Sequence, residues 1–528
     1  MIVSDLSDGQ WADTLRSVFL HVVPETVLVG TACLQFLLGC VYNRRWLWAT
    51  VTVLGLLASM LVASLQRPAV VTVAEAAPVY TDALANLSRW IALLSGLVLI
   101  GLSWPEVSGE RAAEYYGCLL TLIAGVSLAG RANDLLTLFL ALELVSIPTY
   151  VLLYLPRRTR ATHEATIKYF LLSVAASAVL LFGFSYLYGA AGSLRLPVMV
   201  AALAQLHTDA VTPLALLGAV LVLAGLSFRL TVVPFHFYAP DVYQAGPTGV
   251  VALLAVLPKV AGFIALGRIF GWFTPDPYHL PFPSLTQLPL MVWILAVITM
   301  TVGNIVALRQ DNFRRMLAYS SIAHSGYMLI ALVIASAWPD AVGSTLPAAP
   351  LVGGMEALLF YLVTYAMMTF GAFAVLAYLD TPDRPVSAMD DLAGVGRSHP
   401  VMGLALAIVL LGLIGMPFTT GFVGKFLLFV GALTAPALTS EQGRLYQILA
   451  LIAAVNAAVA AVYYLRVIGI LYLREPLRPL PRTWAVLPGL TAIVLAATTL
   501  VFGVYPQPLL RVMQTVAPPP TLLLQITP

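Results

Sequence analysis

The residues that stand out as candidates for chemistry are lysines. The chain has 27 lysines and arginines together, and only three of these are lysines: Lys168, Lys259 and Lys425. All three lie in apolar segments, whereas nearly every arginine lies at the end of such a segment or between two of them. A desolvated lysine can lose its proton near neutral pH, while an arginine stays protonated. We therefore expect the buried lysines to carry protons, and a general bias toward arginine explains only the loops.

Three other ionisable groups also lie in apolar runs. Glu143 has at least six uncharged residues on either side in LTLFLALELVSIPTYVLLY, and Arg229 is its natural partner for an ion pair. His324, in LAYSSIAHSGYMLIALVI, suits a proton relay because its unperturbed pKa is near neutral. Ionisable groups inside a membrane are functional hypotheses by default. The structural alternatives are a buried ion pair for Glu143, a hydrogen-bonded core position for His324, and a position at the membrane surface for Lys168.

Two breaks interrupt the apolar segments that carry these groups. Residues 223–269 hold Arg229, a Pro-Phe-His break at 234–236, and Lys259 in the following run. A second break, GMPFTTGF at 415–422, directly precedes Lys425. Irregular backbone at membrane depth is tolerated only where it is buried or lines a cavity. The breaks therefore predict an internal polar path.

The composition defines the class of protein. Of 528 residues, 60% are hydrophobic and 10% are charged, and the mean hydropathy is +0.93. We predict one all-α polytopic membrane protein with about fourteen transmembrane helices. The three cysteines suggest small core residues rather than a metal site or disulfide, and a single deeply placed histidine argues against haem. The basic runs indicate membrane orientation, and no nucleic-acid site is expected.

The candidate spans follow one another with short connections. They cover 18–40, 46–64, 84–103, 113–130, 132–154, 164–190, 213–246 (broken), 248–272, 287–308, 314–336, 352–379, 401–434 (broken), 445–473 and 483–505. The connections after odd-numbered spans hold more arginines than the others, which predicts that they are cytoplasmic. Both termini would then lie on the non-cytoplasmic side.

An internal repeat suggests the domain organisation. Residues 164–187 (EATIKYFLLSVAASAVLLFGFSYL) resemble residues 356–379 (EALLFYLVTYAMMTFGAFAVLAYL), and each copy is followed by a broken span. The copies lie five spans apart, and an odd offset inverts the second across the membrane. We expect two inverted five-helix repeats. The predicted parts are a three-helix segment (1–110), a first repeat (111–272), a second repeat (287–473), and a C-terminal helix and tail (483–528).

At these residues the chain resembles a known family. Its stretches ALELVSIPTYVLLY, VPFHFYAPDVYQAGPTGV, YSSIAHSGY and GMPFTTGFVGKFLLF are similar to the antiporter-like membrane subunits of respiratory complex I, and most of all to the N type of bacterial NADH:quinone oxidoreductase. The matching stretches cover most of residues 130–470. The L type has a long lateral helix at its C-terminal end, and we expect none after Tyr505 in this chain.

The resemblance implies proton translocation driven by quinone reduction elsewhere in the complex. The glutamate of the family falls on Glu143 and its lysines on Lys168, Lys259 and Lys425. It implies no cofactor in this chain, with NADH, FMN, iron–sulfur clusters and quinone in partner subunits. Sister antiporter-like subunits, small helical subunits and the lipid bilayer are the expected partners, in the bacterial inner membrane.

One departure from the family pattern matters. The family usually has lysine where this chain has Arg229, and a guanidinium does not readily release a proton. We therefore expect Arg229 to be a fixed electrostatic partner of Glu143 and Lys259 to be the first titrating cation. Two other functions stay open: a subunit of a multi-subunit Na⁺/H⁺ antiporter, and a non-conducting scaffold that only anchors its neighbours.

Overall fold

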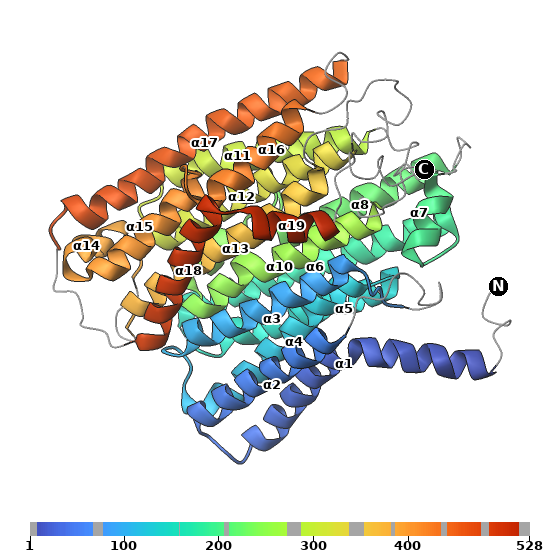
Figure 1. The fold of residues 1–528 in the computed structure, drawn as a ribbon, viewed down its shortest axis with the longest axis horizontal. Helices are drawn as coiled ribbons and strands as arrows, with labels where there is room; N and C mark the ends of the chain where they lie inside the picture. Colours follow the sequence, from blue (N-terminus) through green and yellow to red (C-terminus); the bar gives the residue numbers. More distant parts are fainter. Residues whose placement is uncertain are drawn as a thin grey trace.

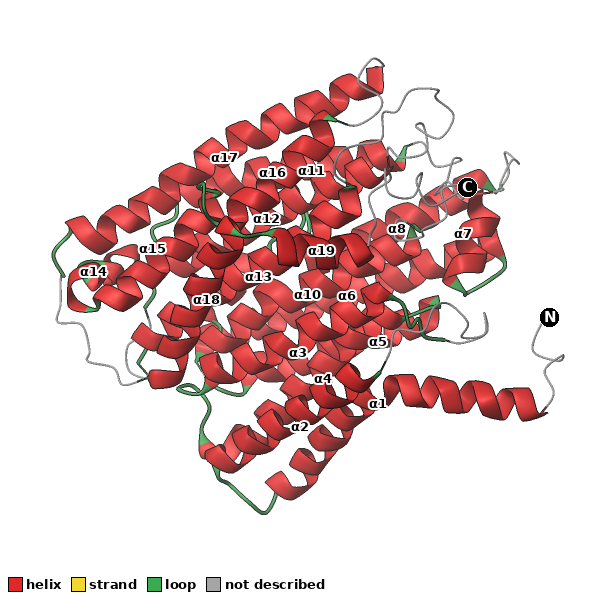
Figure 2. Cartoon of the chain, in the orientation of Figure 1, coloured by secondary structure: helices red, strands yellow, loops and turns green. Residues whose placement is uncertain are grey.

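A computed structural model gives the fold of the chain (Figures 1 and 2). It describes residues 8–66, 78–157, 159–204, 211–271, 287–336, 353–381, 386–434, 441–476 and 485–516. Throughout these ranges the regular secondary structure is helical. Most helices run side by side in one bundle, as expected for a multi-pass membrane protein.

The helices follow the predicted spans closely. The unbroken spans are α1 (Asp8–Gly39), α2 (Arg45–Leu65), α3 (Ala83–Ser103), α4 (Ala112–Arg131), α5 (Leu135–Tyr154), α6 (Arg160–Ala191), α10 (Thr248–Ile269), α11 (Leu288–Leu308), α12 (Phe313–Ser336), α13 (Gly354–Leu379), α17 (Glu441–Leu473) and α18 (Val486–Val504). The broken spans are α8 (Thr212–Leu230) with α9 (Tyr238–Ala245), and α15 (Pro400–Ile414) with α16 (Thr420–Leu433). Among the described residues, 13 helices are long and apolar enough to cross a membrane.

Each break has a local cause in the backbone. Helix α8 is followed directly by Thr231, which adopts a left-handed conformation. Pro234 then prevents the helix from continuing because proline has no backbone N–H to donate. Helix α15 ends at Gly415 with a φ of 89°, a conformation that glycine adopts without steric cost. Helix α16 then starts so close to α15 that any side chain at Gly421 would overlap the Gly412 carbonyl oxygen. Both predicted breaks are present.

Some features were not predicted. The short helices α7 (Leu196–Ala204), α14 (Val395–Ser398) and α19 (Gln507–Val516), and the 3-10 turns at Gly109–Arg111 and Met389–Leu392, lie between or beyond the spans. Helix α19 packs on α3 and α13. Cys118 is buried as expected, but Cys33 on α1 and Cys40 in the turn after it are exposed, so their assignment to the core was wrong.

Three helices form the interior of the bundle. Every residue of α10 is buried, and α12 and α13 are almost as enclosed, while α1, α6, α17 and α18 keep broad exposed apolar faces. Helix α10 packs against α3, α4, α8 and α13. Because the interior is where a bilayer-embedded chain can enclose polar groups, α10, α12 and α13 are the helices to search for a site.

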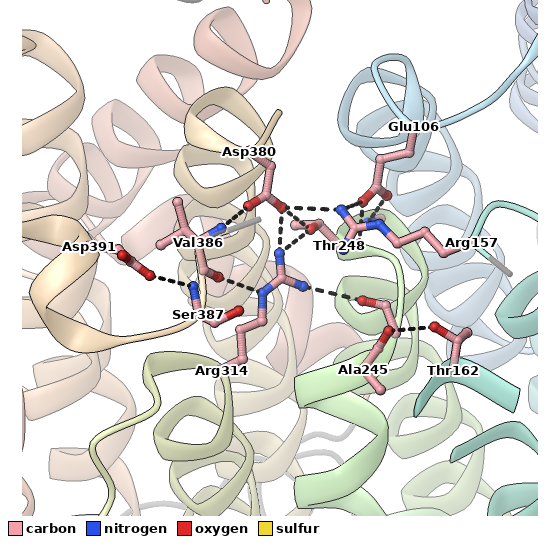
Figure 3. A network of polar contacts seen from close by, with 12 residues as sticks. Glu106, Arg157, Thr162, Ala245, Thr248, Arg314, Asp380, Val386, Ser387 and Asp391 are labelled. Atoms are coloured by element: carbon pink, nitrogen blue, oxygen red, sulfur yellow. Dashed lines mark hydrogen bonds and ion pairs between the residues drawn. The ribbon is translucent and has the colours of Figure 1, made fainter. Parts of the chain in front are cut away.

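At one end of the bundle, the connections after odd-numbered spans are joined by a buried polar network (Figure 3). Arg314 donates hydrogen bonds to the Val386 and Gly246 carbonyls, to Thr248 Oγ1 and to Asp380. Thr248 also donates to Asp380. We call this the odd-connection end.

Glu106 extends this network. Its carboxylate accepts hydrogen bonds from the backbone N–H groups of Thr248 and Gly249, which start α10, and from Arg157 at 2.9 Å. The network therefore fixes the neighbouring ends of α10, α12 and α13.

The connections after even-numbered spans meet at the other end. Arg268 pairs with Asp82 at 2.5 Å and donates to the Gly130 carbonyl, and the Leu196 N–H donates to the Asn133 carbonyl. Burial alone would raise the pKa of Asp82, but Arg268 outweighs it and holds that pKa below its ordinary value. The alternation of the two ends fits the predicted order of crossings.

Replacing Arg314 by methionine should destabilise the protein. The change leaves the Asp380 carboxylate buried beside fewer donors, and breaking a buried ion pair costs about 3–5 kcal/mol. Thermal unfolding of the purified membrane protein measures the effect. Arg474→Met is the matched control because its pair with Asp390 is exposed; an equal loss in both variants would contradict the prediction.

Candidate functional site

Glu143 on α5 and Arg229 in the last turn of α8 form the ion pair that the sequence predicted. Arg229 Nη2 lies 3.0 Å from Glu143 Oε1, and Ser177 Oγ donates to the same oxygen at 2.6 Å. Arg229 Nη1 also donates to the Leu142 carbonyl at 3.0 Å and to Ser146 Oγ at 2.6 Å. The guanidinium is thus held from several sides, as a fixed charge requires.

The end of α8 lies directly against the helix that carries Lys259. Gly262 of α10, one turn after Lys259, has Leu230 and Arg229 so close that a side chain at position 262 would contact both. The Leu230 carbonyl accepts a hydrogen bond of 2.5 Å from Ser325 on α12. The first break therefore brings the Glu143–Arg229 pair beside the central helices.

Lys259 is wholly buried and has neutral partners. Its Nζ donates to the Ser321 carbonyl at 2.5 Å and to Ser321 Oγ at 2.6 Å, and it lies 5.2 Å from the centre of the Tyr365 ring. Tyr243 and Tyr365 share hydrogen bonds with the same Ser321 hydroxyl, at 3.0 and 2.8 Å. In the described part of the chain no carboxylate lies within ion-pair distance of Lys259, so no counter-charge holds the amine in its charged form.

His324 lies one helical turn beyond Ser321 and contacts a group of tyrosines. Its Nδ1 is 2.8 Å from Tyr361 Oη and its Nε2 is 3.3 Å from Tyr464 Oη. The His324 and Tyr365 rings lie 5.2 Å apart, so Tyr365 contacts both Lys259 and His324. The ring nitrogens face hydroxyl groups that both donate and accept hydrogen bonds, which a proton relay needs.

Lys425 is the third buried ionisable group in this interior row, which also contains Lys259 and His324. It lies on α16, is 5% exposed, and donates to the Leu413 and Ile414 carbonyls at 3.0 and 2.7 Å, which the second break leaves free. Its Nζ is 5.0 Å from the centre of the Tyr327 ring. The His324 and Tyr327 rings lie 5.9 Å apart. Aromatic groups therefore connect Lys259, His324 and Lys425.

Lys168 lies apart from this row, at the odd-connection end. Its side chain is 45% exposed and pairs with Glu164 at 2.7 Å and Asp241 at 3.0 Å. Lys168 therefore has counter-charges, whereas no carboxylate of the described residues lies within ion-pair distance of Lys259 or Lys425.

The neutral polar groups around the lysines were not predicted from the sequence. These groups are Ser320, Ser321, Tyr327, Tyr361, Tyr365 and Tyr464, with Asn304 and Asn456 beyond Tyr327. Two signals were available. Tyr361 and Tyr365 are four residues apart, and Ser321, His324 and Ser325 share one helical face, which in an apolar segment marks a face that contacts protein.

Among the described residues, no group of three or more His, Cys, Asp or Glu side chains could hold a metal ion. His236, at the first break, is mostly buried, and its Nδ1 has no hydrogen-bond partner in the described part of the chain. His207 and His279 lie outside the described residues.

A helical bundle with two broken spans, each beside buried cations, defines the class of antiporter-like membrane subunits. Residues 132–440 match the family described as NADH:quinone oxidoreductase/Mrp antiporter, transmembrane. The chain belongs to this family.

Several curated relatives of the chain are named as N subunits. The chain is 32% identical to NADH-quinone oxidoreductase subunit N 2 of Rhizobium meliloti over 96% of this chain and 97% of the relative. It is 36% identical to subunit N of Trichlorobacter lovleyi, over 83% and 84%.

Two solved structures have chains that are similar to this one. A chain of respiratory complex I from Thermus thermophilus, with bound aureothin, matches with 32% identity and a TM-score of 0.72, over 92% of this chain and 98% of that one. A chain of the Mrp complex from Dietzia shares the fold at 21% identity, with a TM-score of 0.76 over 96% and 99%.

Replacing Gly415 by alanine should disturb the position of Lys425. Alanine is strained at a φ of 89°, and its Cβ would lie 2.9 Å from Lys425 Cδ. Holding a non-glycine residue in this conformation lowers the free energy of unfolding by about 1–3 kcal/mol. We expect a lower unfolding temperature together with slower proton pumping. In the control, Gly469→Ala, the added Cβ meets nothing within 4 Å, so both quantities should match the parent.

Proposed function

We propose that this chain is a proton-translocating membrane subunit of an NADH:quinone oxidoreductase. The family and the relatives named as N subunits support the assignment. The observation that carries it is the burial of two lysine amines, Lys259 and Lys425, among neutral hydroxyl, carbonyl and aromatic groups. Such an amine can take up and release a proton without breaking an ion pair.

Under this proposal, the residues have distinct roles. Glu143 takes up and releases a proton beside the fixed charge of Arg229. A change in the net charge of that pair alters the electrostatic potential at Lys259, because charges interact more strongly inside a protein than in water. His324 relays the proton between Lys259 and Lys425, and Lys168 belongs to the outer end of the path.

The rest of the assembly follows from the same proposal. NADH oxidation, with FMN, iron–sulfur clusters and quinone, takes place in partner subunits. Sister antiporter-like subunits and small helical subunits flank this chain in the inner membrane of a bacterium. The odd-connection end faces the cytoplasm, both termini face away from it, and residues 111–272 and 287–473 form two inverted repeats.

Lys259→Met should slow proton pumping through this subunit strongly. Methionine keeps the length and apolar stem of the side chain but cannot accept a proton, and loss of a proton-transfer group slows its step by about 10²–10⁴-fold. The measurement is acidification of proteoliposomes during quinone reduction, with Lys425→Met as the second variant. Pumping at the parent rate in both variants would leave only the scaffold function.

Arg229→Lys tests the fixed-charge role separately. Lysine also pairs with Glu143, so we expect pumping to stay within about threefold of the parent, since only the additional hydrogen bonds of the guanidinium to Leu142 and Ser146 are lost. Arg229→Met should slow pumping far more because it leaves Glu143 without its counter-charge. Equal rates in the two variants would contradict the role. Sodium-dependent pumping, or purification without redox subunits, would favour the Na⁺/H⁺ antiporter.

A further inference from the structure

A second cluster of buried charges lies where the connections after even-numbered spans meet. Glu25 on α1 accepts hydrogen bonds from two nitrogens of Arg89 on α3, both at 2.8 Å, and from Ser127 Oγ on α4 at 2.5 Å. Arg131, the last residue of α4, follows Ser127 by four residues and so shares its face of the helix. It is only 3% exposed. The Arg131 guanidinium is therefore buried close to the Glu25–Arg89 pair.

The ion pair of Arg268 with Asp82 belongs to the same cluster. Nη1 and Nη2 of Arg268, on α10, donate to the Asp82 carboxylate at 2.5 and 2.7 Å. Nη2 also donates to the Gly130 carbonyl, which directly precedes Arg131. Arg131 is in turn close enough to Asp82 to interact with its charge. We call the five residues Glu25, Asp82, Arg89, Arg131 and Arg268 the arginine cluster.

Both carboxylates of the arginine cluster are bound by arginines other than Arg131. The buried Nε and Nη2 of Arg131 have no hydrogen-bond partner, and neither has the buried Nε of Arg268. In the described part of the chain, these three are the only buried arginine nitrogens that lack a partner. Arg314 shows the contrast, because its three nitrogens all donate hydrogen bonds. Arg131 is therefore a buried cation whose donors are not used by the described residues.

The charge balance of the arginine cluster indicates what the free donors bind. Three guanidinium groups and two carboxylates leave one positive charge in excess, because arginine does not readily release its proton. A buried charge without a partner is far more costly than a buried neutral group. A water molecule can accept hydrogen bonds from the free nitrogens, but it leaves the excess charge in place. A monovalent anion accepts the same hydrogen bonds and also makes the cluster neutral.

We propose that Arg131 binds one small monovalent anion, of the size of chloride, within the arginine cluster. Its Nε and Nη2 are enclosed by protein, which favours a halide over a phosphate or a lipid headgroup. The bound anion would link the end of α4 to the end of α10, where Arg268 lies. Arg268 follows Lys259 by nine residues, an axial rise of about 13.5 Å. The site is thus separate from the interior row, and this inference does not rest on the proposed function.

Bromide tests the site directly, because its anomalous X-ray scattering identifies it in crystals of the protein purified with the subunits that accompany it. We expect an anomalous peak within hydrogen-bond distance of Arg131 Nε and Nη2 in the parent. The peak should be absent in Arg131→Gln, which removes the positive charge. Arg511→Gln is the matched control, since Arg511 is exposed on α19, and it should keep the peak.

Thermal unfolding gives a second measurement. A ligand that binds only the folded state raises the unfolding temperature. The parent and Arg511→Gln should both unfold about 2–4 °C higher in chloride than in gluconate of the same ionic strength, because gluconate is too large for an enclosed site. Arg131→Gln should unfold at the same temperature in both salts.

Several results would overturn the anion site. One is a water molecule or a lipid phosphate at Arg131 in place of bromide. Another is an equal response to chloride in Arg131→Gln and in the parent, which would make the effect one of bulk salt. If Arg131→Gln does not assemble, the parent decides alone, since the bromide peak is measured on it. None of these results bears on the proposed function, which the pumping rate of Lys259→Met tests.

Discussion

The structure depends on how an amine is accommodated inside the bundle without a counter-charge. A buried charge that is neither paired nor hydrogen-bonded is too costly to persist. The chain meets this constraint at Lys259 with a serine hydroxyl, a backbone carbonyl and a tyrosine ring, and at Lys425 with two carbonyls freed by the second break. The surrounding hydroxyl and ring groups of α12 and α13 then have to lie on inward faces, which determines how these helices are rotated.

Much of this architecture could be predicted from the sequence because the bilayer imposes strong constraints. The apolar lengths give the spans, and the Pro-Phe segments give both breaks, since proline cannot continue the backbone hydrogen bonding of a helix. The pairing of Glu143 with Arg229 also followed from the sequence, because neither charge is tolerable alone at that depth. The roles of Lys259, His324 and Lys425 remain proposals, although all three lie in the interior as expected.

Other features could not be predicted because they arise between helices that are distant in sequence. Nothing in the periodicity of α10 indicates that Ser321 is the partner of Lys259, or that Tyr464, more than a hundred residues away, contacts His324. Arg314 looked like a signal of orientation at the start of a span, yet it is buried and ties three segments together. In the sequence, an arginine at a helix end is equally compatible with an exposed orientation signal and with a buried hydrogen-bonding group, and only the packing distinguishes the two.

The network at the odd-connection end has a consequence for the motion of this subunit. With the ends of α10, α12 and α13 anchored to one another, sliding or tilting of these helices would break several buried hydrogen bonds at once. What this anchoring leaves free is local rearrangement of side chains and water, which needs none of the collective helix motions that take microseconds to milliseconds. Any rearrangement of the buried polar groups therefore leaves the helical frame in place.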